Sequence, residues 1–595
     1  MSEPPTRTDA DLALVAIALA GGCIAVLYAG GVASALVSGH PVPHGHPLAE
    51  LAAFAHAGDP SLAWHAPVGP PVVYWAVSAA VALAAAALVR FVWRLFRPAQ
   101  RSAPGDDPTT IEGLADRRQV ERAAGAAQLL AQAATLRPSV TKPVPRDVGL
   151  FLGTSRGVEC WMGVRDSAVV LGPPGSGKGL TLVIPSILDA PGAVITTSTR
   201  PDNLTVTLAA RQADGRPVGV FDPQGLAPGV PASLRWSPVR GCERPQTAML
   251  RAAALTAGGA KGVTDANFWE QQTATAVRCL LHAAAIAGRP PSTLCEWSLS
   301  ASSAREAVSL LATNPAASPA WDRALDGIVS AEQRTRDSIW AMVANTFAAL
   351  ADPGVLAAVT PDEGSQFDPA DFLRRRGTLY LLGTASGASA SAGLVSAFIE
   401  DLVDVARRLA AASPGARLDP PLALVLDEAA NYPLPSLGSL MSEGGGSGIV
   451  TTPVLQSLAQ ARDRWGRETA TAIWDSATAK IILPGSSNAD DLADISRLLG
   501  ERETVEQSQS QQIGAGSGGR SISTSTRRQA ILDPAAIRTL RSGHALLLLR
   551  SAQPIVLTLR PWIARRDARQ LQTQRTQIEQ QIRAAALDEI GVTYD

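Results

Sequence analysis

Two long apolar runs dominate the hydrophobic pattern at the start of the chain. The first extends from Leu12 to Val37 and the second from Val72 to Val89, and neither contains a charged residue. A helix needs about 20 apolar residues to cross the hydrocarbon core of a bilayer, with a range of about 17–25. The pattern therefore predicts two transmembrane helices, 12–37 and 72–89.

The charges that flank these runs predict their orientation. The stretch 38–71 between them has no Lys or Arg, whereas four arginines closely follow the second run: Arg90, Arg94, Arg97 and Arg101. Because short cytoplasmic segments carry the excess of basic residues, 38–71 is expected to be an external loop. Residues 1–98 are then an N-terminal membrane region of a multi-pass protein of the cell (cytoplasmic) membrane, with both termini in the cytoplasm.

The rest of the chain mostly alternates short strand-like runs with helical segments. We interpret 99–144 as a linker with a leading helix, and 145–246 together with 359–563 as one nucleotide-binding domain of the α/β class. Such alternation is typical of a parallel sheet with crossover helices. Residues 247–358 break it, because their apolar residues follow helical spacing alone. This block is predicted to be an all-α domain inserted into the α/β domain.

Two further segments stand apart in composition. Residues 501–528 are rich in Ser, Gln and Gly and are expected to form a flexible surface loop. Residues 564–595 are a polar C-terminal tail of helical character.

Composition excludes several other classes of protein. The chain has 595 residues, of which 46% are hydrophobic and 18% charged, and its formal net charge is -1. That apolar content excludes a wholly disordered chain. The five cysteines are scattered without a CxxC pair, which argues against a disulfide scaffold or a thiolate zinc site. A globally basic nucleic-acid coat is excluded by the charge balance.

A glycine-rich turn joins a strand-like run, 168–171, to a helical segment, 180–188. The turn comprises Gly172, Pro173, Pro174, Gly175, Ser176, Gly177, Lys178 and Gly179. Strand, glycine-rich turn and helix are the context of a P-loop, in which backbone N–H groups and the helix N-terminus surround phosphates. We predict that these eight residues bind the phosphates of ATP and that Lys178 reaches the β- and γ-phosphates.

The residue after the lysine departs from the usual P-loop. A Ser or Thr normally contacts Mg²⁺ there, but this chain has Gly179. Thr181 lies two positions further on, so its hydroxyl projects from a different side of the helix. Magnesium coordination is then expected to rely on water and on an acidic strand.

That acidic strand is predicted at 422–426, where five apolar residues precede Asp427 and Glu428. An entirely apolar run is typical of a central strand buried on both faces. In P-loop ATPases the first carboxylate of such a pair holds Mg²⁺ and the second polarises the attacking water. We assign these roles to Asp427 and Glu428, respectively.

Gln456 follows the next strand-like run, 448–453, and opens a predicted helix at 457–465. A glutamine at such a strand end can orient the lytic water or sense the γ-phosphate. A polar residue at a helix N-terminus with no catalytic role is the alternative.

Four segments together resemble the type IV secretion coupling proteins, the membrane-anchored ATPases of conjugative DNA transfer. They are GPPGSGKGLTLVIPSIL (172–188), FDPQG (221–225) with Trp236-Ser237-Pro238, LVLDEAANYPLPSL (424–437) and VLQSLAQARDRWG (454–466). The likeness extends over about 145–560, and the two N-terminal spans have the family's placement. One departure is the segment 197–202, Thr-Ser-Thr-Arg-Pro-Asp, which stands where many members have an Asp-Pro-Lys type sequence.

The resemblance implies a RecA-like motor with an all-α insertion, working as a homo-hexamer with ATP and Mg²⁺. It also implies recruitment of a relaxase–DNA complex, single-stranded DNA with bound protein, to the components of a secretion channel for export driven by hydrolysis. DNA as a substrate comes from the resemblance alone, because the net charge does not indicate it.

Three alternatives keep the same nucleotide site. A protein-effector secretion receptor of the same family would have a weak ATPase, in keeping with Gly179. A double-stranded DNA translocase usually has more membrane spans and a terminal winged-helix reader, and neither is evident in the sequence. A nucleotide-binding scaffold would hydrolyse ATP without stimulation by any polymer.

Overall fold

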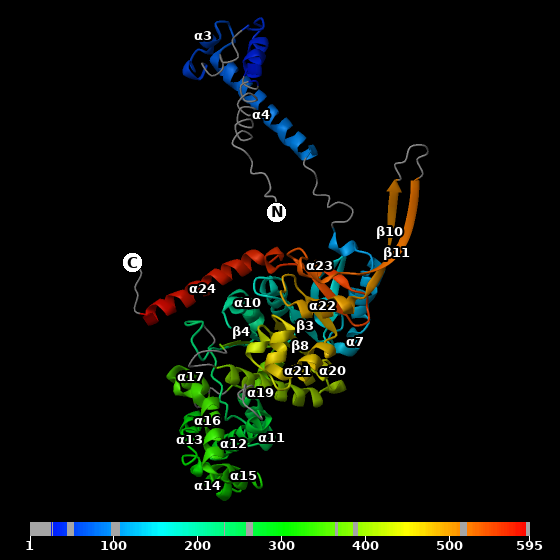
Figure 1. Cartoon of the computed structure of the whole chain (residues 1–595). Coiled ribbons are helices and arrows are strands. Elements are labelled where there is room, and N and C mark those ends of the chain that lie inside the picture. Colours follow the sequence, from blue (N-terminus) through cyan, green and yellow to red (C-terminus); the bar gives the residue numbers. More distant parts are fainter. Residues whose placement is uncertain are drawn as a thin grey trace. The chain divides into compact units, whose positions relative to one another are not determined.

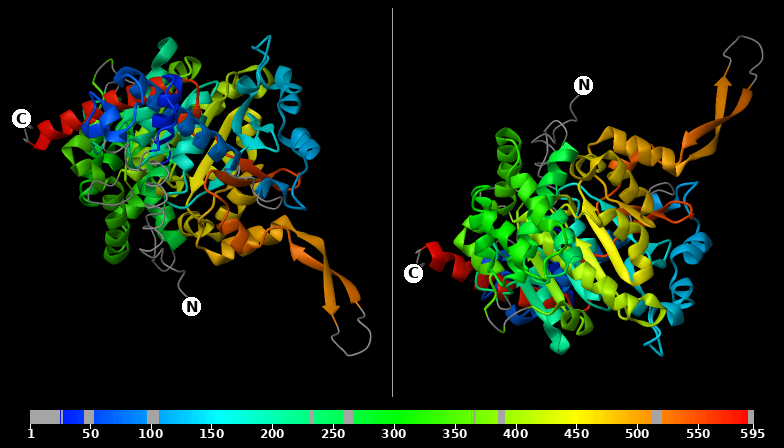
Figure 2. Two further views of the ribbon diagram at one scale, coloured as in Figure 1. Left: turned by 90° about the horizontal axis from the view of Figure 1, so that it is seen from above. Right: turned by 90° about the horizontal axis from the view of Figure 1, so that it is seen from below.

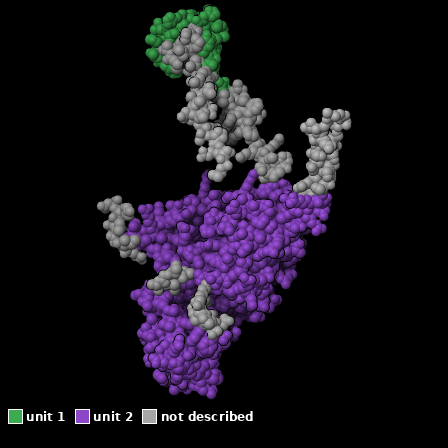
Figure 3. All heavy atoms as spheres, viewed as in Figure 1, with its two compact units in different colours: residues 1–106 green, residues 107–595 purple. Residues whose placement is uncertain are grey.

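The computed structural model describes residues 25, 28–44, 53–96, 107–230, 233–257, 266–362, 364, 367–384, 391–511 and 520–590. The chain divides into two compact units, 1–106 and 107–595 (Figure 3). Each unit has its own hydrophobic core, and each is described by itself.

Unit 1 is a small helical body. It contains the helical segment Tyr28–Val37, α3 (Pro60–Trp64) and α4 (Pro71–Phe96). Trp64 and Tyr74 lie in its core, and the indole Nε1 of Trp64 donates a hydrogen bond to the Tyr74 hydroxyl at 3.1 Å. The segment predicted as an external loop thus contains a short helix, α3, which begins after the N-cap Asp59 with Pro60 as its first residue. This helix contributes Trp64 to the core.

The two predicted membrane spans stay predictions. Most of 12–37 lies outside the described residues, and 72–89 falls within α4. Among the described residues, no single helix is long and apolar enough to cross a membrane, the apolar segments here being Tyr28–Val37 and Pro71–Ala85. A bent pair in unit 2, Gln333–Ala351 with Pro353–Val359, passes that test by length and composition.

The centre of unit 2 is an 11-stranded sheet (Figures 1 and 2). Its strands are β1 (Gly149–Ser155), β2 (Val158–Gly163), β3 (Ala168–Leu171), β4 (Val194–Ser198), β5 (Val218–Phe221), β6 (Thr378–Leu382), β7 (Leu422–Leu426), β8 (Ile449–Leu455), β9 (Ala479–Ile482), β12 (His544–Leu549) and β13 (Ile555–Thr558). Their order is β2-β1-β13-β12-β9-β3-β8-β7-β4-β6-β5.

The sheet has a parallel and an antiparallel part. From β9 to β5 every neighbouring pair is parallel, and from β9 through β12, β13 and β1 to β2 every pair is antiparallel. The parallel part contains both strands to which the sequence analysis assigns nucleotide chemistry. The predicted RecA-like α/β class is confirmed, whereas the antiparallel part of the sheet was not predicted.

Alternate residues of the central strands face two different cores. Val169 and Leu171 of β3 belong to one buried cluster, and Ala168 and Val170 belong to the other. Because side chains alternate across a strand, an entirely apolar strand fits a sheet covered on both faces.

The covering helices come from several parts of the chain. They are α5 (Arg117–Ala124), α6 (Ala126–Leu130), α7 (Ala133–Leu136), α8 (Pro145–Val148), α9 (Ile184–Asp189), α10 (Asp202–Gln212), α19 (Ala392–Ala411), α20 (Leu437–Ser447), α21 (Leu458–Ser476), α22 (Ala489–Leu499), α23 (Pro534–Arg538) and α24 (Ala568–Ile590). The leading helix predicted before the sheet is divided into α5, α6 and α7, because Gly125 ends the first of them in an extended conformation.

A helical block interrupts the α/β alternation between β5 and β6 (Figure 1). It comprises α11 (Pro245–Thr256), α12 (Ala266–Ile286), α13 (Pro291–Ser298), α14 (Arg305–Thr313), α15 (Trp321–Val329), α16 (Gln333–Phe347), α17 (Pro353–Val359) and α18 (Pro369–Arg374). Ile339 and Phe347 of α16 are buried in its core, as helical spacing of apolar residues predicts.

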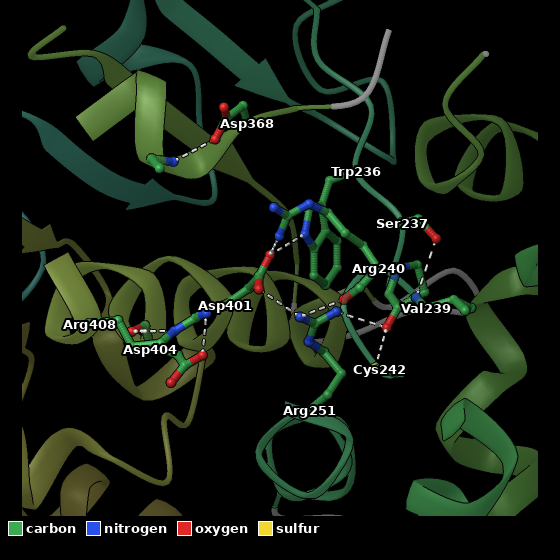
Figure 4. Close-up of polar contacts among 12 residues, drawn as sticks. Trp236, Ser237, Val239, Arg240, Cys242, Arg251, Asp368, Asp401, Asp404 and Arg408 are labelled. Carbon is green, nitrogen blue, oxygen red and sulfur yellow. Dashed lines mark hydrogen bonds and ion pairs between the residues drawn. The ribbon is translucent and has the colours of Figure 1, made fainter. Parts of the chain in front are cut away.

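A buried ion pair joins this block to the sheet domain (Figure 4). Arg251 of α11 contacts Asp401 of α19 at 2.9 Å, and both side chains are almost fully buried. Arg240 and the indole N–H of Trp236 also reach the carboxylate, each at 3.0 Å. The Trp236 ring stacks on Phe398 with centroids 4.6 Å apart. The first helix of the block is thus fixed to a helix that precedes the acidic strand.

Two segments differ from their predicted form. β10 (Glu501–Gln511) and β11 (Arg520–Ala530) form an antiparallel ribbon, so the prediction of a loop over 501–528 is wrong for these residues. Their backbones pair residue by residue, and such pairing does not require an apolar composition. The polar tail forms α24, which packs on α10 through Ile578 and Leu571.

Candidate functional site

The glycine-rich turn lies directly at the carboxyl end of β3. Gly175 and Gly177 have φ of 78° and 83°, in the left-handed region that favours glycine. A Cβ added at either position would meet no heavy atom within 4 Å. The turn is therefore shaped by glycine for an open face rather than for close packing, which fits a loop whose N–H groups bind phosphate.

The helix after the turn begins with a π-helical stretch, Gly179–Val183, and continues as α9. Thr181 donates its hydroxyl to the carbonyl oxygen of Gly177 at 3.0 Å. This hydroxyl is thus engaged by the backbone of the glycine-rich turn.

The strand order brings the distant candidate residues to one edge of the sheet. β8 lies between β3 and β7 and is parallel to both. Gln456 follows β8, so it stands at the same edge as Lys178 and Asp427, between the strands that carry them. Ligands of open α/β sheets bind at the carboxyl ends of the strands. The backbone N–H of Gln456 donates to Oε1 of Gln460 at 3.3 Å, and the N-cap of α21 is Ser457.

Asp427 is buried at the end of β7 with few hydrogen-bond donors around it. Its Oδ1 accepts from the Glu428 backbone N–H at 3.1 Å, and its Oδ2 accepts from the Asn203 amide at 3.4 Å. Burial raises the pKa of the Asp427 carboxyl, Glu428 raises it further, and the nearby Lys178 ammonium acts in the opposite direction. A buried carboxylate with so little compensation is suited to a cation.

Glu428 has a conformation that few residues other than glycine adopt, with φ of 51°. Its carboxylate Oε2 accepts from the Thr199 hydroxyl at 2.5 Å and from the Asn431 amide at 3.2 Å. Backbone strain of this kind is concentrated at functional sites. Two hydrogen bonds fix the orientation of the carboxylate that the sequence analysis assigns to the attacking water.

A third element of the site is not evident from the sequence. β4 and the residues that follow it contribute three polar side chains. Thr197 near the end of β4 donates to the Asp427 carbonyl oxygen at 2.8 Å, Thr199 contacts Glu428, and Asn203 of α10 contacts Asp427. The signal was the departure of 197–202 from the Asp-Pro-Lys type sequence. Without the parallel pairing of β4 with β7, nothing connected that segment to the acidic pair.

Within the described ranges, no three His, Cys, Asp or Glu side chains gather where they could hold a metal ion.

Comparison with known families agrees with this geometry. The model of the family described as "Type IV secretory system Conjugative DNA transfer" matches residues 121–584. The chain belongs to this family. The match extends from α5 into α24 and includes the helical block, and it confirms the resemblance to the coupling proteins.

Solved structures show the same fold at low sequence identity. The bacterial conjugative coupling protein TrwBΔN70, in its unbound form, is 18% identical with a TM-score of 0.50, covering 72% of this chain and 91% of that chain. TrwB with the ATP analogue ADPNP is 16% identical with a TM-score of 0.51 and coverages of 72% and 92%. TrwB with ADP and Mg²⁺ is 17% identical with a TM-score of 0.50 and the same coverages. No curated protein matches the chain in sequence.

Proposed function

We propose that this member of the conjugative DNA transfer family is a membrane-anchored ATPase that recruits relaxase–DNA to a type IV secretion channel and couples ATP hydrolysis to its export. One observation carries the ATPase part of this proposal. The glycine-rich turn, Gln456 and the pair Asp427–Glu428 follow neighbouring parallel strands at a single edge of the sheet, which supports one nucleotide site.

The residues of the site fit ATP and Mg²⁺. The backbone N–H groups of 175–179 would hold the phosphates, since Pro173 and Pro174 have none. Lys178 would contact the β- and γ-phosphates, and Asp427 would hold Mg²⁺. Bound Mg²⁺ supplies charge neutralisation on the phosphates. The related TrwB structures contain ADPNP in one case and ADP with Mg²⁺ in another, which supports the same pair of ligands here.

The remaining chemistry belongs to the side chains. Glu428, oriented by Thr199 and Asn431, accepts a hydrogen bond from the attacking water and directs its lone pair toward the γ-phosphate. Gln456 orients the same water or senses the γ-phosphate from its place between the two motif strands. Hydrolysis removes the γ-phosphate contacts and thereby changes the position of the elements that hold them.

Family membership supports the partners and the location. The proposal places residues 12–37 and 72–89 across the cytoplasmic membrane, the ATPase unit and both termini in the cytoplasm, and the working form as a homo-hexamer on the channel. The substrate strand would be held mainly through its phosphates, so binding should be salt-sensitive and tolerant of sequence.

The test is ATP hydrolysis by the full chain in lipid nanodiscs, with and without single-stranded DNA. We expect DNA to stimulate hydrolysis, and Lys178→Ala and Glu428→Gln each to lower it by about 10²–10³-fold. Arg467→Ala, an exposed residue of α21 outside the site, is the control and should retain hydrolysis.

Other outcomes would favour the alternatives. Turnover that only double-stranded DNA stimulates would indicate a duplex translocase. Nucleotide binding with slow turnover that DNA does not change would favour a protein-effector receptor, or a scaffold if no secreted protein stimulates it. Failure of the wild-type chain to bind ATP would overturn the proposal.

A further inference from the structure

Gly179 leaves the magnesium side of the phosphate loop without a hydroxyl. In most P-loop proteins the Ser or Thr after the lysine holds Mg²⁺. The nearest hydroxyl along this helix, that of Thr181, donates to the Gly177 carbonyl oxygen. If ATP binds here as proposed above, one protein group is lacking at a defined place beside the ion.

The side chain of Asn203 lies next to that place. Outside its own helix and chain neighbours, the heavy atom nearest to a Cβ added at Gly179 is Asn203 Oδ1, at 4.0 Å. Asn203 belongs to the first turn of α10 and is 3% exposed. An amide oxygen therefore faces the space into which the usual Ser or Thr side chain would project.

Hydrogen bonding fixes the direction of this amide. The Asn203 Nδ2 donates to Asp427 Oδ2 at 3.4 Å. A carboxylate only accepts, so the NH₂ side must face Asp427 and Oδ1 must point away from it. Among the residues that the structure describes, Oδ1 receives no hydrogen bond. This oxygen is not one of the fully buried polar atoms that lack a partner, so it is an acceptor open to a ligand on the side of Gly179.

We propose that Asn203 provides the metal-facing oxygen that Gly179 lacks: Oδ1 accepts a hydrogen bond from a water on nucleotide-bound Mg²⁺, while Nδ2 orients Asp427. Mg²⁺ usually retains several waters in proteins, so an acceptor for such a water is a natural partner. A neutral amide also adds no third negative charge beside Asp427 and Glu428. Asn203 is thus a positioning residue that acts through water and through Asp427.

The experiment measures how strongly a metal ion tightens nucleotide binding. ADPNP is titrated into the full chain in nanodiscs by calorimetry, once with EDTA and once with Mn²⁺ as the probe ion. The dissociation constant with EDTA divided by that with Mn²⁺ gives a ratio that reports metal binding separately from phosphate binding and from turnover. Loss of an outer-shell partner lowers metal affinity by about 10–100-fold. We therefore expect Asn203→Ala to lower this ratio at least tenfold and to leave the dissociation constant measured with EDTA unchanged.

Two further variants make the test specific. Gly179→Ser combined with Asn203→Ala restores the hydroxyl of the usual P-loop and should return the ratio toward the wild-type value. Asn431→Ala removes an amide that contacts Glu428 rather than Asp427, and it should leave the ratio unchanged.

The possible failures can be told apart. An unchanged ratio in a folded Asn203→Ala variant would overturn this inference and leave the proposed function standing. If that variant does not fold, Asn203→Leu decides, because it keeps a similar volume and removes both amide atoms: a lowered ratio supports the inference and an unchanged one overturns it. A wild-type chain that binds ADPNP under neither condition would overturn both proposals.

Discussion

Asp401 and Asp427 are both buried carboxylates of unit 2, but they differ in how many hydrogen-bond donors and positive charges surround them. Asp401 is 3% exposed and Asp427 is 9% exposed. Asp401 accepts from Arg251, Arg240 and Trp236 at 2.9–3.0 Å (Figure 4). All its partners belong to the chain itself.

Asp427 has no such set of donors. It accepts a backbone N–H at 3.1 Å and an amide at 3.4 Å, and no arginine contacts it among the described residues. Burying a carboxylate is costly unless it is paired. A carboxylate that the fold pairs completely belongs to the architecture, whereas one that the fold leaves poorly paired is suited to a ligand that brings positive charge.

The largest effect on stability is expected from Asp401→Asn. This substitution leaves the buried Arg251 without its carboxylate, and breaking a buried pair costs about 3–5 kcal/mol. Urea unfolding of the full chain measures the loss. The matched control is Asp362→Asn, because Asp362 pairs with Arg235 at 3.0 Å where both side chains are exposed, 77% and 46%. It should cost less than about 1 kcal/mol, and equal losses would contradict the comparison.

Asp427→Asn should separate function from stability. Burial raises the pKa of Asp427, which means that the fold disfavours its charged form. Removing that charge should leave the free energy of unfolding unchanged or raise it by about 1 kcal/mol, since such replacements are often neutral or stabilising. Magnesium-dependent hydrolysis should fall by about 10²–10³-fold. A loss of stability as large as that of Asp401→Asn would show that Asp427 is also architectural.

The sequence predicted those parts of the fold and site that have a recognisable pattern within a short stretch of residues. The all-apolar strand before Asp427 and the turn before Lys178 each have a local pattern with a known physical reason. The order of the strands has no such local pattern. That β8 lies between β3 and β7, and so brings Gln456 to the site, depends on long-range packing.

The features that the sequence did not predict also depend on pairing between distant segments. Thr199 and Asn203 have unremarkable neighbours in sequence, and only the pairing of β4 with β7 brings them to the acidic residues. The ribbon of β10 and β11 was missed because its composition is that of a loop, while backbone pairing fixes its form. The strong local signal of a Ser-, Gln- and Gly-rich stretch concealed a pairing that depends on register.

Two glycines extend the comparison from charge to shape. At Gly445 in α20 a Cβ would lie 1.9 Å from the Arg165 carbonyl oxygen, whereas at Gly177 it would meet nothing within 4 Å. Gly445→Ala should cost about 1–3 kcal/mol through overpacking, with nucleotide affinity unchanged. Gly177→Ala should cost about 1–2 kcal/mol through its left-handed backbone and should abolish ADPNP binding. Thermal unfolding with calorimetry of ADPNP binding measures both, and loss of binding in Gly445→Ala would contradict the distinction.

Gly179→Ala should have the smallest effect, and in the opposite direction. Gly179 lies in a helix without a left-handed φ, and the nearest atom to an added Cβ outside that helix is 4.0 Å away, an ordinary contact. Alanine in place of a helical glycine stabilises by about 0.5–1 kcal/mol, partly by restricting the unfolded chain. Thermal unfolding should show this gain with hydrolysis within about twofold of wild type, because a methyl group offers Mg²⁺ no ligand. A loss of stability would mean that the backbone conformation at this position requires glycine. A gain in stability would mean that Gly179 makes this helix less stable than alanine would, and that the fold accepts this cost as it accepts the cost of the poorly paired Asp427.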